Sequence, residues 1–194
     1  MQTLDELITR FTLANRAKPL RVATDGIHLR PAAVLLAFEQ TERGVELLLT
    51  ERPTHLKAHP GQIAFPGDKP EQSDNNLVET ALREAFEEVA LAPNDVKVLG
   101  QLPQHNTLTG FSITPVVGIV NSATPFTPIL DANEVADSFR VPLRFLLQPQ
   151  HRQTLWFSRR NQRTPITFIP FEQRLIWGAT AAIIDTFCRQ LSHD

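Results

Sequence analysis

The stretch NLVETALREAFEEVAL, from Asn76 to Leu91, carries the strongest secondary-structure signal in the sequence. Apolar residues recur every three to four positions from Leu77 to Val89, which is typical of a helix with one buried face. Asn76, followed three residues later by Glu79, is typical of a capped helix start, where both side chains bind groups of the first turn. The sequence therefore predicts an amphipathic helix that begins at Asn76 and ends at Val89.

The same helix carries three carboxylates on its polar side, at Glu84, Glu87 and Glu88. Spacings of three and four residues bring these side chains to one face, where like charges repel each other. A divalent cation would remove that repulsion, and Mg²⁺ prefers carboxylate oxygens, water and substrate phosphates as ligands. Taken alone, the helix leaves two interpretations open, a metal site and an ordinary solvated acidic face.

The preceding segment, LLTERPTHLKAHPGQIAFPGD from Leu48 to Asp68, favours the metal site. It begins as a predicted strand, continues through basic residues and ends with Phe65-Pro66-Gly67. A glycine lets the backbone approach a ligand closely, and a structured loop of this length is uncommon unless it has a function. A strand, a basic loop and a carboxylate-bearing helix together predict a site for a metal-bound diphosphate.

The rest of the pattern predicts an α/β fold. Helical spacing is expected at Leu4–Leu13 and Ala179–Leu191, and a hairpin joins the apolar runs Ala32–Phe38 and Val45–Thr50. Further strands are expected at Val96–Leu102, Ile113–Val120, Ser138–Val141, Thr154–Phe157 and Thr167–Phe168. Strands on both sides of one central helix, with another helix at the end, predict a mixed sheet covered by helices.

The combined motif resembles that of the Nudix hydrolases. Arg83, Glu84, Glu87, Glu88 and Leu91 match the signature R-E-x-x-E-E followed by x-G and an apolar residue. The segment ending at Gly67 is similar to the added motif of the coenzyme A (CoA) pyrophosphatase branch, roughly LLT-x-R…HL-x-x-H-x-GQ-x-AFPGG, and Asp74 takes the acidic position between the two motifs. The stretches LTGFSITPVVGIV and LIWGATAAII are also similar to that branch, so the resemblance covers about residues 30–185.

This resemblance implies a Nudix-like α/β/α sandwich with a mixed β-sheet. It also implies one Nudix domain over residues 1–194, composed of a helical extension (1–29) and a core (30–194). The resemblance implies an Mg²⁺-dependent diphosphatase, with Mn²⁺ as a substitute metal, that would cleave CoA or its derivatives to 3′,5′-ADP and a 4′-phosphopantetheine product.

The resemblance also assigns roles to individual residues. Glu84 and Glu88 would be the principal metal ligands, Glu87 a third ligand, and the Gly67 carbonyl a further one. Arg83 would hold the glutamates in place rather than touch substrate. The general base varies within the family; our candidate is Glu134, in the stretch LDANEVADSF, for which a solvated loop position is the alternative.

Four residues are candidate substrate contacts, each with a plainer alternative. Arg52, Lys57 and His59 could bind phosphate or simply lie at the surface, and the planar guanidinium of Arg52 suits bidentate binding best. Phe65 could line the site or belong to the core. Trp177 is expected to pack against the closing helix. His105, in a Pro-flanked loop, could face the nucleoside end of a substrate, but a surface position is the expectation.

Two positions depart from the branch pattern. Asp68 stands where the branch has a second glycine, and Ala90 stands where it has a glycine near the end of the motif. Asp68 could add negative charge beside the metal site. Ala90 should matter little, provided that its backbone does not need a positive φ.

Composition excludes several other classes. A net charge of −2 provides no basic footprint for nucleic acid, and no apolar run approaches a membrane span. The acidic start, MQTLDEL, is unlike a signal peptide, so a cytoplasmic protein is expected. The sequence contains no P-loop, dinucleotide fingerprint or Ser-His-Asp arrangement.

Two alternatives to CoA hydrolysis stay open. The first is a Nudix enzyme for ADP-ribose or a dinucleoside polyphosphate, although the chain lacks the tyrosine associated with the latter branch. The second is a Nudix-fold binding module that has lost catalysis. The expected partner is a small nucleoside diphosphate; a homodimer is compatible with the family, but no residue here marks an interface.

Overall fold

The protein is described by a computed structural model that covers residues 3–14, 17–20, 22, 24, 26, 28–56, 59–121, 125–159 and 162–192. Short 3-10 helices occupy Pro93–Asp95 and Pro149–His151. The other elements, in chain order, are α1 (Leu4–Leu13), β1 (Arg30–Thr41), β2 (Gly44–Glu51), β3 (Ile63–Ala64), α2 (Leu77–Val89), β4 (Val96–Gln101), β5 (His105–Asn106), β6 (Phe111–Val120), β7 (Asp137–Pro142), α3 (Leu143–Leu146), β8 (Gln153–Arg159), β9 (Gln162–Phe171), β10 (Arg174–Trp177) and α4 (Gly178–Ser192).

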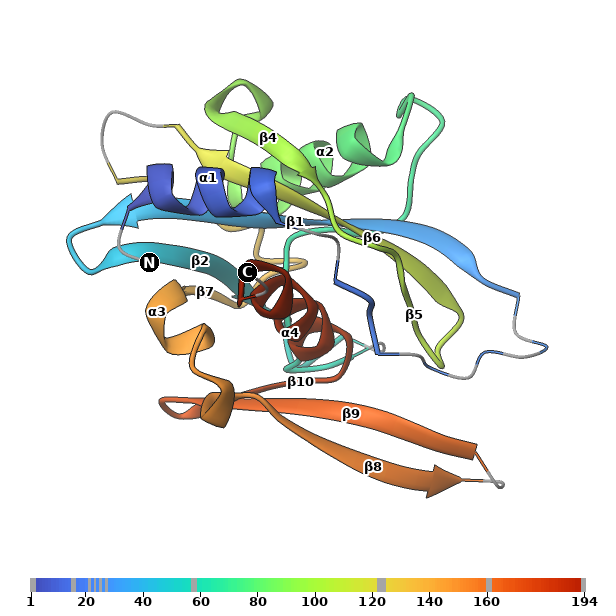
Figure 1. The fold of residues 1–194 in the computed structure, drawn as a ribbon. Coiled ribbons are helices and arrows are strands. Elements are labelled where there is room, and N and C mark those ends of the chain that lie inside the picture. The colour runs from blue at the N-terminus through green and yellow to red at the C-terminus, as the bar shows by residue number, and fades with distance from the viewer. Residues whose placement is uncertain are drawn as a thin grey trace.

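A mixed sheet forms the centre of the molecule (Figure 1). Its strand order is β3-β2-β1-β6-β4, with β7 also paired to β2 and β5 to β6. β1 and β6 run parallel, from Arg30 opposite Phe111 to Phe38 opposite Ile119, and the other pairs are antiparallel. The predicted hairpin is confirmed as β1 and β2.

The two faces of this sheet bury different hydrophobic clusters. Along β1, Leu36 and Phe38 join side chains of α4 in one cluster, whereas Leu35 and Ala37 join side chains of α2 in the other. This alternation follows from the two-residue period of a strand. Figure 1 accordingly shows α2 and α4 on opposite faces of the sheet, which confirms the predicted α/β/α sandwich.

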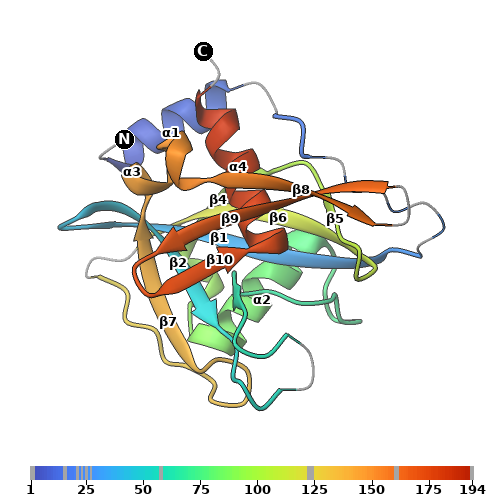
Figure 2. The same ribbon diagram turned by 90° about the horizontal axis from the view of Figure 1, so that it is seen from below.

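A second, three-stranded antiparallel sheet, ordered β10-β9-β8, adds a layer beyond α4 (Figure 2). The sequence predicted only short parts of it, because Pro165 and Pro170 interrupt the strand signal of β9. Trp177, at the end of β10 and directly before α4, is 43% exposed.

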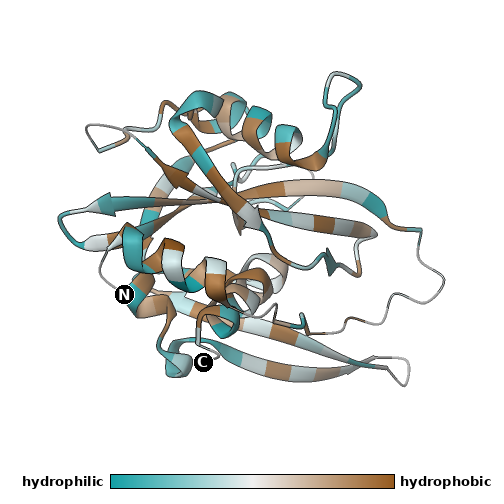
Figure 3. Ribbon diagram, turned by 45° about the horizontal axis from the view of Figure 1, so that its top comes forward, coloured by the Kyte–Doolittle hydropathy of each residue, from teal (hydrophilic) through white to brown (hydrophobic). Residues whose placement is uncertain are grey.

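α2 forms where the sequence predicted it, with polar and apolar residues alternating along it (Figure 3). Oδ1 of Asn76 accepts hydrogen bonds from the backbone N–H groups of Val78 (2.9 Å) and Glu79 (3.1 Å), so the predicted cap is confirmed. The carboxylate of Glu79 reaches back to the N–H of Asn75 (2.9 Å). At the other end Ala90 has a φ of 58°, so this residue does need the left-handed conformation that a glycine adopts more easily.

His105 corrects another expectation. It is 5% exposed in β5, paired with Ile113 of β6, rather than at the surface. Burial lowers the pKa of His105 to about 4, because the charged ring would lose its hydration. Among the described residues, no helix combines the length and the apolar character that a membrane crossing requires.

Candidate active site

Three glutamates from two segments far apart in the sequence meet beside α2. Glu84 and Glu88 lie one turn apart on the helix and are 7% and 4% exposed. Glu134 comes from the exposed loop before β7. One oxygen of each carboxylate lies within 4.8 Å of an oxygen of the other two. The sequence predicted Glu134 only as a base in a nearby loop, and the structure adds it to this carboxylate cluster.

Backbone hydrogen bonds hold the Glu134 loop on the C-terminal end of α2. The N–H of Ile129 donates to the carbonyl of Val89, and the N–H of Asp131 donates to the carbonyl of Glu88, both at 3.1 Å. A turn then closes with the N–H of Glu134 donating to the Asp131 carbonyl at 3.0 Å. The loop thereby occupies the otherwise unpaired carbonyls of the helix end, which fixes the position of Glu134.

The cluster carries excess negative charge in a buried place. Burial raises the pKa of Glu84 to about 7, with smaller contributions from the neighbouring charges of Asp68 and Glu87. Burial also raises the pKa of Glu88 to about 8, helped by the charges of Glu84 and Glu134. Both shifts reflect the cost of ionising carboxylates that are close together and poorly hydrated.

Arg83 organises one side of the cluster. Its Nη1 donates to Oε1 of Glu84 at 2.7 Å and to Oε2 of Glu87 at 2.8 Å. Its Nε and Nη2 donate to the carboxylate of Asp74 at 3.0 Å each, and Nη2 also reaches the carbonyl of Lys69. Hydrogen bonds from Arg83 lower the pKa of Asp74 to about 2. Arg83 therefore orients Glu84 while Asp74 anchors Arg83.

Gly67 is required because its backbone lies very close to the backbone of β1. A Cβ at Gly67 would lie 2.2 Å from the carbonyl oxygen of Ala33 and 2.6 Å from Cα of Val34, and its φ of 149° is unusual for other residues. This approach lets the N–H of Gly67 donate to Oε1 of Glu88 at 3.2 Å. Asp68 follows at an exposed position, where its charge raises the pKa of Glu84 after the larger effect of burial.

The donor set fits a divalent cation. Hard cations such as Mg²⁺ bind carboxylate oxygens, and these three carboxylates converge within a space of the size that one ion fills. A cation bound there would also offset the repulsion that raises the pKa of Glu84 and Glu88, after the larger effect of burial.

The other residues singled out from the sequence take different places. Glu87 is outside the three-carboxylate cluster; its side chain is 53% exposed and binds Arg83. Arg52, directly after β2, is half-buried, and within the described part of the chain its Nε has no hydrogen-bond partner. His59 is exposed at a tight turn with a φ of 56°. Phe65 is 2% exposed in the main hydrophobic cluster, which favours its core interpretation. Lys57 lies outside the described residues.

Sequence reasoning placed Asp74 in the motif but did not pair it with Arg83. The two are nine positions apart, and their contact depends on the path of the loop from Asp68 to Asn75 as it enters the helix. The sequence did contain a signal for this ion pair: an acidic residue, Asp74, precedes the pair Arg83-Glu84, and a buried guanidinium needs a carboxylate partner.

A family model described as the NUDIX domain matches residues 28–167, well over half of the chain. The chain belongs to the Nudix family. A protein of Pectobacterium atrosepticum named "Uncharacterized Nudix hydrolase NudL" is 38% identical over 189 residues, which cover 97% of this chain and 95% of the relative. A protein of the same name from Escherichia coli O7:K1 is 37% identical over the same shares.

Among solved structures, a Caenorhabditis elegans Ap4A hydrolase binary complex superposes with a TM-score of 0.50 at 16% identity, over 58% of this chain and 80% of that one. This likeness concerns the fold alone. Together with the relatives, the family match makes the protein a Nudix hydrolase, an enzyme of a family that generally uses divalent metal ions.

Proposed function

We propose that this Nudix hydrolase cleaves the diphosphate of CoA or a CoA derivative, with Mg²⁺, to 3′,5′-ADP and 4′-phosphopantetheine or its acylated form. The observation that carries the proposal is the convergence of Glu84, Glu88 and Glu134 beside Gly67. Gly67 ends the segment that resembles the CoA branch, so the branch motif and the carboxylate cluster form one site.

Each residue near the cluster has a distinct role in the proposed reaction. Glu84 and Glu88 hold the metal, with the carbonyl of Gly67 as a further ligand, and Arg83 keeps Glu84 in place. A metal held there would supply positive charge for the phosphate oxygens and would acidify the attacking water. Glu87, which shares Arg83 with Glu84, acts through that arginine.

The chemistry is a displacement at phosphorus. A water oxygen forms a bond to one phosphorus while the bond from that phosphorus to the bridging oxygen breaks. Glu134 receives the proton of the water at its carboxylate, a role suited to the one exposed member of the cluster. Arg52, whose Nε has no hydrogen-bond partner among the described residues, acts electrostatically on Glu88, so it can bind the phosphate oxygens as negative charge shifts between them.

We further propose that the chain acts as a single Nudix domain in the cytoplasm, with residues 1–29 as an extension of a core over 30–194. The packing of α1 against α4, β1 and β4 supports the single-domain proposal, because it joins the extension to the core.

The direct experiment incubates the purified protein with CoA, ADP-ribose and a dinucleoside polyphosphate, each with and without Mg²⁺, and separates the products by chromatography. The proposal expects metal-dependent release of 3′,5′-ADP from CoA. Turnover of another substrate instead would keep the metal site and contradict the CoA assignment. Absence of any turnover with Mg²⁺ or Mn²⁺ would favour a binding module, with Asp68 as the first residue to revert to glycine.

A further inference from the structure

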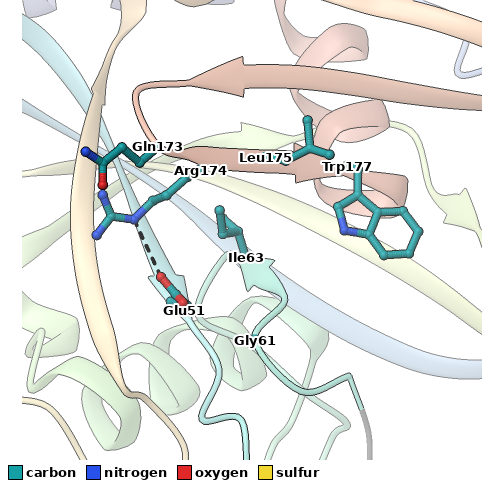
Figure 4. Close-up of a pocket in the computed structure, with 7 residues that line it drawn as sticks. All are labelled: Glu51, Gly61, Ile63, Gln173, Arg174, Leu175 and Trp177. Carbon is teal, nitrogen blue, oxygen red and sulfur yellow. Dashed lines mark ion pairs between the residues drawn. The ribbon is translucent and has the colours of Figure 1, made fainter.

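A groove lies at the end of β2, beside β10 (Figure 4). It has a volume of about 460 Å³ and is lined by Glu51, Gly61, Ile63, Gln173, Arg174, Leu175 and Trp177. That volume is within the range of about 300–1,000 Å³ found for small-molecule sites. None of these residues was singled out as a ligand contact by the sequence motifs.

The groove adjoins the carboxylate cluster across the end of one strand. Glu51 is the last residue of β2 and lines the groove, whereas Arg52, the next residue, is close enough to Glu88 to act on it electrostatically. Successive side chains of an extended chain point to opposite faces. The carbonyl of Glu51 also accepts the N–H of Ala136, two residues after Glu134. A molecule with its diphosphate at the cluster can therefore extend one arm around Arg52 into the groove.

The charge of the groove disfavours a phosphorylated arm. Arg174 is its one cation among the lining residues, and the guanidinium is already shared by Asp137 (2.5 Å), Glu51 (3.5 Å) and Glu172 (4.0 Å). Three carboxylates around one guanidinium leave the region net negative. A phosphate monoester placed there would meet like charge, and Arg174, although its Nε has no hydrogen-bond partner among the described residues, is already paired with these carboxylates.

Two large apolar side chains in an otherwise mostly polar lining favour an uncharged arm. Exposure alternates along β10: Ile176 is buried, whereas Leu175 and Trp177, which are among the lining residues, are 49% and 43% exposed. Large apolar side chains with this much exposed surface bind apolar parts of a ligand. The polar ends of Gln173 and Glu51 add hydrogen-bonding groups that can pair with amides.

We propose that this groove binds the uncharged arm of the diphosphate substrate, which in a CoA-like substrate is the amide-containing pantetheine chain, and that Leu175 and Trp177 determine that specificity. The proposal rests on the proposed function for the identity of the arm. The phosphorylated nucleoside arm then lies on the other side of the cluster, away from the carboxylates that surround Arg174.

The two tryptophans of the chain permit a direct test that does not need turnover. Trp156, on β8, is 52% exposed and does not line the groove. Trp156→Phe leaves Trp177 as the only emitter, and Trp177→Phe leaves Trp156 as the matched control. Pantetheine, at up to about 10 mM because so small a neutral fragment binds weakly, should change the emission of Trp156→Phe with saturation and leave that of Trp177→Phe unchanged.

Adding Leu175→Ala to Trp156→Phe should weaken pantetheine binding about tenfold, whereas adding Leu155→Ala, a matched control 53% exposed on β8, should not. Thermal unfolding of every variant verifies folding. The absence of an emission change in a folded Trp156→Phe would overturn the proposal, as would a saturable change with 3′,5′-ADP in place of pantetheine. Saturable pantetheine binding without CoA hydrolysis would support the groove assignment and contradict the proposed function alone.

Discussion

Nη1 of Arg83 donates to Oε1 of Glu84 at 2.7 Å, while Nε and Nη2 of the same guanidinium grip Asp74. One arginine thus links an anchor that is 4% exposed to a carboxylate of the cluster. Because the fork geometry fixes both ends at once, a change at Asp74 is transmitted to Glu84 without touching it.

Asp74→Asn should therefore reduce metal-dependent kcat about tenfold or more, as expected when a partner that orients a ligand is lost. It should also lower the free energy of unfolding by about 2 kcal/mol, because charge-assisted hydrogen bonds are lost. Steady-state kinetics and urea unfolding measure the two effects. Asp5→Asn, at an exposed position in α1, is the control. Wild-type kcat in Asp74→Asn would show that the anchor does not position Glu84.

Ala90→Gly should stabilise the protein. Ala90 ends α2 with a φ of 58°, a conformation that costs an L-residue about 1 kcal/mol or more relative to glycine. Its N–H donates to the carbonyl of Phe86 at 2.9 Å, so the conformation is fixed by the helix end. Urea unfolding should show a gain of about 1 kcal/mol. Ala92→Gly, where φ is −63°, should instead be neutral or destabilising; equal effects at the two positions would refute the strain argument.

Glu134→Gln distinguishes a base from a metal ligand. If Glu134 takes the proton of water, kcat should fall about 100-fold or more while metal affinity changes little. A rate near wild type across the pH range would remove Glu134 from the mechanism, and a large loss of metal affinity would make it a ligand instead.

Burial of His105 should make the stability of the folded protein depend on pH. Its pKa is lowered by burial from 6.5 to about 4, so the unfolded chain binds a proton more readily than the folded one. The contribution of neutral His105 is fully present above pH 6.5 and declines as pH falls towards 4. Thermal unfolding of His105→Gln should therefore show a shallower decline between pH 6.5 and 4 than wild type. His55→Gln, at an exposed position, should behave like wild type; a His105→Gln curve parallel to wild type would contradict the burial argument.

The sequence predicted the structural features that depend on residues close to one another along the chain. The helix from Leu77 to Val89 forms as expected because its cap and its apolar stripe are local features. Glu84 and Glu88 followed from the same helical period, which places them together on the polar side of the helix. The position of Glu134 against them has no such local signal, because it depends on hydrogen bonds between the loop around Asp131 and the end of the helix.

Other features could not be predicted from the sequence, because they depend on contacts between segments far apart in the chain. His105 was expected at the surface, but it pairs with Ile113 of β6 and is 5% exposed. The groove of Leu175 and Trp177 forms where β10 meets the end of β2, two segments more than a hundred residues apart. Long-range pairing of this kind leaves no periodic signal in either segment.

Direct titration of the purified protein with Mg²⁺ or Mn²⁺ by calorimetry tests the central claim, that the buried carboxylates of α2 hold the catalytic cation. Glu88→Gln removes a cluster member, whereas Glu87→Gln removes an exposed glutamate of the same helix that binds Arg83. The account predicts one metal site in wild type, affinity reduced about 10- to 100-fold in Glu88→Gln, and a change of about threefold or less in Glu87→Gln. Unchanged affinity in Glu88→Gln, with loss of binding in Glu87→Gln, would contradict it.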